Sequence, residues 1–146
     1  MQRRRLPTDT DYRQLLALRT GIRRFEHWSE EQAHRAGLTP VQHQLLLAIR
    51  GHTGQDPPSI GDIAEALLLR HHSATELVDR AAEAGLVARG HDPSDGRIVR
   101  LSLTPLGNRR LTSLSLLHLE ELSRLGPRLG SLINTLSSMA NPTSRA

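Results

Sequence analysis

The stretch Asp92-Pro93-Ser94-Asp95-Gly96-Arg97-Ile98-Val99-Arg100-Leu101-Ser102-Leu103-Thr104 decides the fold of this chain. Its first half is rich in turn formers, because Asp-Pro and Asp-Gly both favour reversals and Gly96 tolerates a positive φ. Its second half alternates apolar and polar side chains, as a half-buried strand does. We therefore predict a loop that runs into a strand and ends at a helix cap.

A partner for this strand stands just upstream, at Leu86-Val87-Ala88-Arg89. Two short strands joined by a loop that carries Asp95 and Arg97 make a β-wing. An isolated two-stranded ribbon is only marginally stable, so the wing must pack on other elements. A simpler interpretation is also open, in which Asp95 and Arg97 form a solvated ion pair at a turn.

The chain before the wing begins with two predicted helices. Apolar residues recur every three or four positions over about Thr10–Ala36, and Gly37 fits the end of this helix. A second helix follows, with Thr39 as its cap, a proline at its first position and Gln42 closing a capping box. We expect it to end near Gly51.

A pair of shorter helices then leads into the wing. Ser59 and Asp62 match a second capping box, which opens a helix of about two turns. After a turn over Leu68–His71, another helix is expected over about His72–Ala84, and Gly85 ends it. Its buried stripe is predicted at Ala74, Leu77, Val78 and Ala81.

After the wing, Thr104-Pro105 opens a helix whose leucines cover more than one face, as in a helix that is buried on two sides. Gly126-Pro127 is expected to break it, and a last helix holds Leu129 to Met139. The predicted order is α-α-α-α-β-β-α-α. The fold class is mainly α with a small β-wing (α+β).

Composition excludes several function classes. The chain has 146 residues, which suits one compact domain, and it lacks cysteine, so disulfides and thiolate metal sites are unavailable. All 19 basic side chains are arginine, which rules out a P-loop lysine or a Schiff base. The net charge of +4 permits an anionic partner. No apolar run has the length of a membrane span, so we expect a cytoplasmic protein. The sequence predicts no cofactor and no metal.

Two short helices joined by a tight turn and followed by a β-wing make a winged helix-turn-helix. This arrangement places the second helix of the pair in a major groove of DNA. The residues left over after the buried stripe is assigned would face the groove: Arg70, His71, His72, Ser73, Thr75, Glu76 and Arg80. Arg80 lies further along the helix and is expected to meet a backbone phosphate.

The run from Leu38 to Thr104 resembles the MarR family of bacterial transcription regulators. The most diagnostic match is Asp95-x-Arg97 followed by Leu101-Ser102-Leu103-Thr104-x-x-Gly107. Weaker matches are Leu38-Thr39-x-x-Gln42, Ile63-Ala64-Glu65-x-Leu67, Leu77-Val78-Asp79-Arg80 and Gly85-Leu86-Val87. Glu76 departs from the family, in which a basic or polar residue is common.

The resemblance implies a homodimeric repressor that binds a near-palindromic operator in double-stranded DNA. It implies that Arg97 enters the minor groove and that Asp95 supports it, and Ser59 is expected to contact a phosphate. Residues 1–38 and 104–146 would form the helical dimerisation region, and 39–103 the DNA-binding lobe. Family members often bind small aromatic compounds between these parts. Possible lining residues here are Trp28, His43, Arg50 and His118.

Other interpretations stay open beside this one. The eight histidines allow a zinc-responsive regulator, with His71-His72 as a fragment of a site. The fold also allows a protein-interaction dimer that does not bind DNA. The three arginines at positions 3–5 are either an arm that seeks phosphates or an ordinary chain terminus. An enzyme is not expected, since the chain has no Gly-x-Ser-x-Gly nucleophile elbow.

Overall fold

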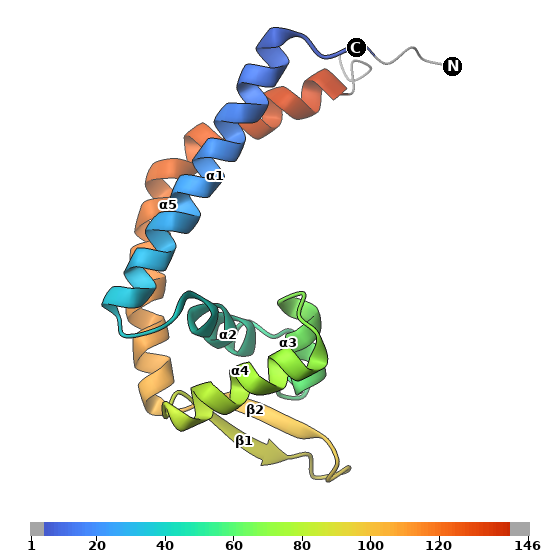
Figure 1. Ribbon diagram of the computed structural model, residues 1–146, viewed down its shortest axis with the longest axis vertical. Coiled ribbons are helices and arrows are strands. Elements are labelled where there is room, and N and C mark those ends of the chain that lie inside the picture. Colours follow the sequence, from blue (N-terminus) through green and yellow to red (C-terminus); the bar gives the residue numbers. More distant parts are fainter. Residues whose placement is uncertain (1–4, 141–146) are drawn as a thin grey trace. The chain divides into compact units, whose positions relative to one another are not determined.

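The computed structural model describes residues 5–140 (Figure 1). Helix α1 spans Asp9–Arg35, α2 Pro40–Arg50, α3 Ile60–Ala66 and α4 His71–Glu83. Strands β1 (Val87–His91) and β2 (Val99–Leu103) follow, and helix α5 spans Pro105–Ala140. This is the predicted mainly helical fold with one two-stranded antiparallel sheet. Within residues 5–140, no helix is both long and apolar enough to cross a membrane.

The chain divides into two compact units. The helical unit consists of α1 up to Ser29 and α5 from Leu117, and the winged unit consists of Glu30–Leu116. The dimerisation and DNA-binding roles expected for the two regions stay predictions. Arg3 and Arg4 of the expected arm, and residues 141–146 of the expected dimerisation region, lie outside the described residues.

The helix starts follow from local sequence, as expected. Thr39 Oγ1 accepts from the Gln42 amide at 3.1 Å, and Gln42 Oε1 accepts from the Thr39 amide at 3.0 Å. Ser59 and Asp62 repeat this exchange at the start of α3, at 3.1 and 2.9 Å. These bonds satisfy amides that have no partner inside a helix, so both capping boxes are confirmed.

The core of the winged unit is built from leucine, isoleucine, valine and alanine. The predicted stripe of α4 is buried, and its Leu77, Val78 and Ala81 share one core cluster with the residues listed here: Leu45, Leu46, Ile63, Leu86, Leu101 and Leu114. The strands pair in the register Val87↔Leu103 to His91↔Val99. Leu101 of β2 is buried while its neighbour Ser102 is exposed, which confirms the predicted alternation.

The predicted bounds of α4 and β1 need correction. α4 begins at His71 rather than His72, because Arg70 takes the extended cap conformation and the turn closes earlier, through the Leu69 amide and the Ala64 carbonyl at 2.8 Å. Leu68, at φ 55°, makes the reversal. β1 runs over Val87–His91 rather than 86–89, since its pairing with β2 continues to His91.

The predicted break at Gly126-Pro127 is wrong, because α5 continues through Pro127 to Ala140. A proline inside a helix removes one hydrogen bond and crowds the carbonyl four residues earlier, here that of Ser123. Ser123 and Pro127 are both exposed, so water can reach this carbonyl. Beyond the proline, Leu129 packs against α1, where its Cδ2 lies 2.7 Å from the position that a Cβ on Gly21 would take. This packing favours one long helix over two.

Candidate nucleic-acid interface

Arg97 stands at the tip of the wing and is held by Asp95. Arg97 Nε and Nη2 donate to the two carboxylate oxygens of Asp95, both at 3.1 Å, and the Arg97 amide donates to Asp95 Oδ1 at 3.1 Å. The Arg97 side chain is nevertheless 90% exposed. A guanidinium has five N–H donors, so most of them stay available to an acceptor outside the protein.

The same contact sets the charges at the tip. The bidentate bond from Arg97 holds the pKa of Asp95 below its usual value, and Asp95 raises the pKa of Arg97. Both groups are therefore charged at neutral pH. Asp95 thus holds the charged guanidinium of Arg97 in one position at the wing tip, which agrees with the supporting role expected for Asp95.

A second acidic residue, Asp92, organises the base of the wing loop. Its Oδ1 accepts from the Ser94 amide at 2.8 Å and the Asp95 amide at 3.0 Å, and its Oδ2 accepts from Arg100 Nε at 2.9 Å. These amide bonds and Arg100 lower the pKa of Asp92. Arg100 lies opposite Gly90, and Asp92 is two residues further on the same face, which makes the two charged residues diagonal neighbours.

Sequence reasoning missed the role of Asp92 and Arg100. An aspartate that accepts from amides two and three residues ahead is a known turn signal, so the hydrogen bonds from the loop amides to Asp92 could have been predicted from the Asp-Pro-Ser-Asp pattern. The ion pair between Asp92 and Arg100 could not have been predicted, because it depends on the strand register. A further ion pair, between Arg89 of β1 and Asp79 of α4, was missed because it depends on how the strand packs against the helix. It ties the wing to α4.

Helix α4 turns a polar face outward. Arg70, His71, His72, Glu76 and Arg80 are exposed, while Ser73 and Thr75 are half-buried. Thr75 Oγ1 donates to the His71 carbonyl at 3.0 Å, so this hydroxyl is partly engaged within the helix. The cap residue Arg70 forms no side-chain bond to the first turn. The amides of that turn are therefore available to an anion.

Ser59 lies at the start of α3, in the same unit. Its Oγ accepts the Asp62 amide, which leaves its own O–H free to donate to a phosphate. The Ser59 amide lowers the pKa of Asp62, which keeps the cap charged. Ser59, the polar face of α4 and the wing all belong to the winged unit; contact of each with DNA remains a prediction.

The four residues proposed to line a ligand site fall into two groups. In the helical unit, Trp28 and His118 lie with ring centroids 4.9 Å apart, and both contact the ring of Phe25. Trp28 also lines a cavity of about 620 Å³ between α1 and α5, which His118 does not line. His118 Nε2 instead bonds Ser29 Oγ at 2.7 Å.

The other two candidates lie on α2 in the winged unit. His43 is buried, and Arg50 is exposed at the rim of a cavity of about 420 Å³ that His43 does not line. The four residues are thus not gathered around one cavity within either unit. Among residues 5–140, no three His, Asp or Glu side chains are grouped so that they could hold a metal ion.

Comparison with known proteins points to one family. The model of the MarR family matches residues 36–98. The HTH-type transcriptional repressor MdtR of Bacillus subtilis (strain 168) is 31% identical over 78 residues, which are 53% of this chain and 48% of MdtR. The chain thus spans about half the length of this curated relative.

Solved structures share the fold over most of the chain. AbsC, a MarR family transcriptional regulator from Streptomyces coelicolor, superposes with a TM-score of 0.72 at 22% identity and covers 94% of each chain. CouR from Rhodococcus jostii RHA1, bound to p-coumaroyl-CoA, superposes with a TM-score of 0.64 at 23% sequence identity, and the match covers 90% of this chain and 93% of CouR. The transcriptional repressor CouR bound to a 23-mer DNA duplex superposes with a TM-score of 0.66 at 25% sequence identity, and the match covers 86% of this chain and 90% of CouR.

Proposed function

We propose that this chain, whose residues 36–98 match the model of the MarR family, is a sequence-specific DNA-binding transcriptional repressor, active in the cytoplasm and not an enzyme. The observation that carries the proposal is the wing tip. Arg97 is 90% exposed and yet held in place by Asp95, and this cation belongs to the same unit as the outward polar face of α4.

In this proposal the two elements read different grooves. α4 enters the major groove, where its exposed histidines and arginines reach base edges or phosphates. Arg97 enters the adjoining minor groove, whose narrow, electronegative form attracts a guanidinium. Two protomers related by a two-fold axis would bind half-sites about one helical turn apart.

Exposed apolar residues of the helical unit support a dimer. Large apolar side chains on both of its helices are between 40% and 66% exposed: Tyr12, Leu15, Leu16, Ile22, Leu117, Leu119, Leu122 and Ile133. Apolar surface in such amounts is costly in water unless a partner covers it. We propose that a second copy of the chain covers it.

A small aromatic ligand would release the repressor from DNA. The relative CouR, which carries p-coumaroyl-CoA in one structure and a DNA duplex in another, supports this mode of regulation. No observation in residues 5–140 favours the zinc-responsive alternative.

The direct test is titration of the full-length protein against labelled fragments of its own promoter region and against shuffled fragments, at several salt concentrations. We expect binding to one native fragment that is about 1,000-fold tighter than to its shuffled form. We also expect affinity to fall steeply as salt rises. Equal affinity for native and shuffled fragments would instead favour the protein-interaction dimer.

A further inference from the structure

The wing carries one histidine, His91, close to its tip. It is the last residue of β1, it pairs with Val99 of β2, and its side chain is exposed. Its Nδ1 lies 3.0 Å from the carbonyl oxygen of Gly96, the residue directly before Arg97. A carbonyl oxygen can only accept, so Nδ1 must be the atom that carries the proton. This bond therefore determines both the position of the ring and its tautomer.

The other ring nitrogen, Nε2, then has two different chemistries. In a neutral ring with its proton on Nδ1, Nε2 is an acceptor and has no proton to donate. When the ring takes up a second proton, Nε2 becomes a positively charged donor. The bond from Nδ1 to Gly96 fits both forms, because Nδ1 is protonated in each. Titration thus changes the free edge of the ring without turning the ring.

The charged groups around His91 are engaged with one another. On the loop, the neighbouring strand and the helix packed against β1, they form three ion pairs: Asp92 with Arg100, Asp95 with Arg97, and Asp79 with Arg89. The other titratable side chains of that helix, α4, form no bond with His91: His71, His72, Glu76, Arg80 and Glu83. Within residues 5–140 no carboxylate pairs with His91, so its protonated ring is available to an anion outside the protein.

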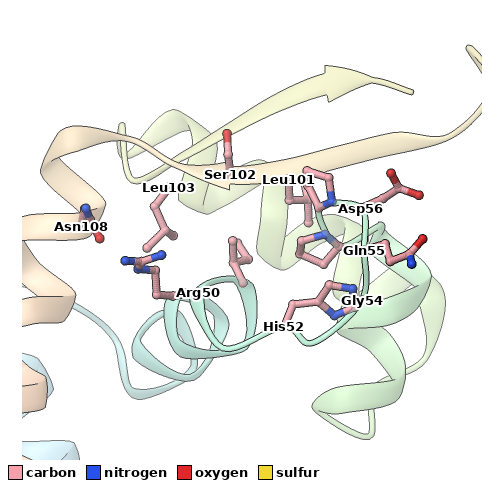
Figure 2. A pocket seen from close by; sticks show the side chains of 12 residues that line it. Arg50, His52, Gly54, Gln55, Asp56, Leu101, Ser102, Leu103 and Asn108 are labelled. Carbon is pink, nitrogen blue, oxygen red and sulfur yellow. The ribbon is translucent and has the colours of Figure 1, made fainter. Parts of the chain in front are cut away.

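The strands hold His91 in place from behind. β1 is paired with β2 along its whole length, and β2 is itself bonded to the loop over residues 51–58, where the Leu101 amide donates to the Pro58 carbonyl at 2.9 Å. Figure 2 shows Leu101 of β2 beside Asp56 of this loop. The backbone thus fixes His91 from one side and its bond to Gly96 fixes it from the other.

We propose that His91 is a further DNA-contacting residue of the wing, whose protonated Nε2 binds a backbone phosphate beside the minor groove that Arg97 enters. This contact rests on the proposed function, since it requires the wing to lie on DNA. Phosphate oxygens accept hydrogen bonds, so they attract the protonated Nε2 and repel the lone pair of the neutral ring.

The contact makes DNA affinity depend on pH. Bound DNA holds the proton on His91 more tightly than the free protein does, so affinity rises as pH falls through the range in which histidine titrates, about pH 8 to 5. His71 and His72 differ from His91, because no hydrogen bond within residues 5–140 fixes the tautomer of either ring. A neutral ring of that kind can still turn an N–H toward DNA.

The first experiment needs no DNA. Nitrogen-15 NMR of the imidazole rings in the full-length protein at about pH 8 reports which nitrogen carries the proton, and the His91→Asn variant assigns the signal. We expect the proton of His91 on Nδ1, with Nε2 unprotonated. A neutral ring with its proton on Nε2 would overturn the proposal.

The second experiment measures affinity for the native promoter fragment at about pH 6 and 8, over a range of salt. His91→Asn keeps a donor near the position of Nδ1 and removes Nε2, whereas His91→Gln places a neutral donor near Nε2. His34→Asn is the matched control, since His34 is an exposed histidine in the last turn of α1. All three variants retain His71 and His72, so the contribution of these rings cancels in the comparison.

We expect the unaltered chain and His34→Asn to gain about ten-fold more affinity than His91→Asn when pH falls from about 8 to 6, as for a hydrogen bond between charged groups. Their salt slope at the lower pH should be steeper by about 0.9 for each phosphate contacted. His91→Gln should bind with the weaker pH dependence of His91→Asn. Each variant should melt at the temperature of the unaltered chain.

The outcomes separate this contact from the proposed function. Specific binding with the same pH dependence in His91→Asn and His34→Asn would overturn the contact and leave the proposed function standing. A pH dependence that is lost in His91→Asn with no difference in salt slope would overturn phosphate as the partner. Absence of specific binding at both pH values would overturn the proposed function, and the contact with it.

Discussion

Gly107, in the first turn of α5, tests how closely the wing and this helix are packed. A Cβ built on Gly107 would lie 2.1 Å from the carbonyl oxygen of Leu86, which is backbone and cannot rotate away. The same oxygen accepts from the Thr104 amide at 3.1 Å, and Thr104 Oγ1 accepts from the Gly107 amide at 3.0 Å. Gly107→Ala should therefore push the first turn of α5 away from Leu86 and weaken the hydrogen bonds that join the two ends of the wing.

The cost follows from this geometry. The backbone must open by about 1 Å to restore an ordinary carbon–oxygen contact. Forcing extra atoms into a packed site costs about 1–3 kcal/mol, and a weakened bond from Thr104 adds about 1 kcal/mol. Alanine recovers up to about 1 kcal/mol over glycine in a helix. We expect a net loss of about 1–3 kcal/mol, which lowers the melting temperature by about 3 °C per kcal/mol.

Gly61→Ala is the matched control, because Gly61 stands in the first turn of α3 in the same unit and its Cβ would meet only Ser59 Oγ, at an ordinary 3.6 Å. Thermal unfolding followed by circular dichroism compares the two variants with the unaltered chain. Gly61→Ala should be neutral or slightly stabilising. If Gly107→Ala unfolds at the same temperature as Gly61→Ala, the close approach of α5 to Leu86 does not exist in solution.

Two further predictions concern the start of α1 and the turn before α4. The Arg5 guanidinium and the Thr8 amide lower the pKa of Asp11 from 3.8 to about 2, so its carboxylate stabilises the fold above pH 3.8 and this contribution is lost as pH falls towards 2. Acid titration of helicity should therefore be flatter in that window for Asp11→Asn, and an unchanged profile would contradict the ion pair. Leu68 has φ 55° and is 92% exposed, so Leu68→Asn should stabilise the chain by about 1 kcal/mol, measured by urea unfolding; a lower midpoint would refute the strain.

The features that could be predicted from the sequence are those determined by residues close together along the chain. The caps at Thr39 and Ser59 lie within three residues of their partners, and the stripe of α4 follows from helical spacing alone. The pairing of Asp95 with Arg97 was readable for the same reason. Each of these features is decided by neighbours along the chain.

Features that depend on distant residues were not predictable. Arg100 reaches Pro57, 43 residues away, and Arg89 reaches Asp79 across two elements, so neither contact leaves a local pattern. The continuation of α5 through Pro127 likewise depends on α1, where Gly21 makes room for Leu129. A local breaker signal was thus overridden by tertiary packing.

The central claim, that the wing-tip arginine contacts DNA, is tested most directly by Arg97→Ala against Arg109→Ala. Both arginines are exposed, but Arg109 lies on α5. Binding to the native promoter fragment is measured by fluorescence anisotropy over a range of salt, with the melting temperature of each variant. Arg97→Ala should weaken binding about ten-fold and reduce the salt slope by about one, at an unchanged melting temperature, while Arg109→Ala should bind as the unaltered chain does. Equal affinities for the two variants, or a loss that follows a lower melting temperature, would contradict the claim.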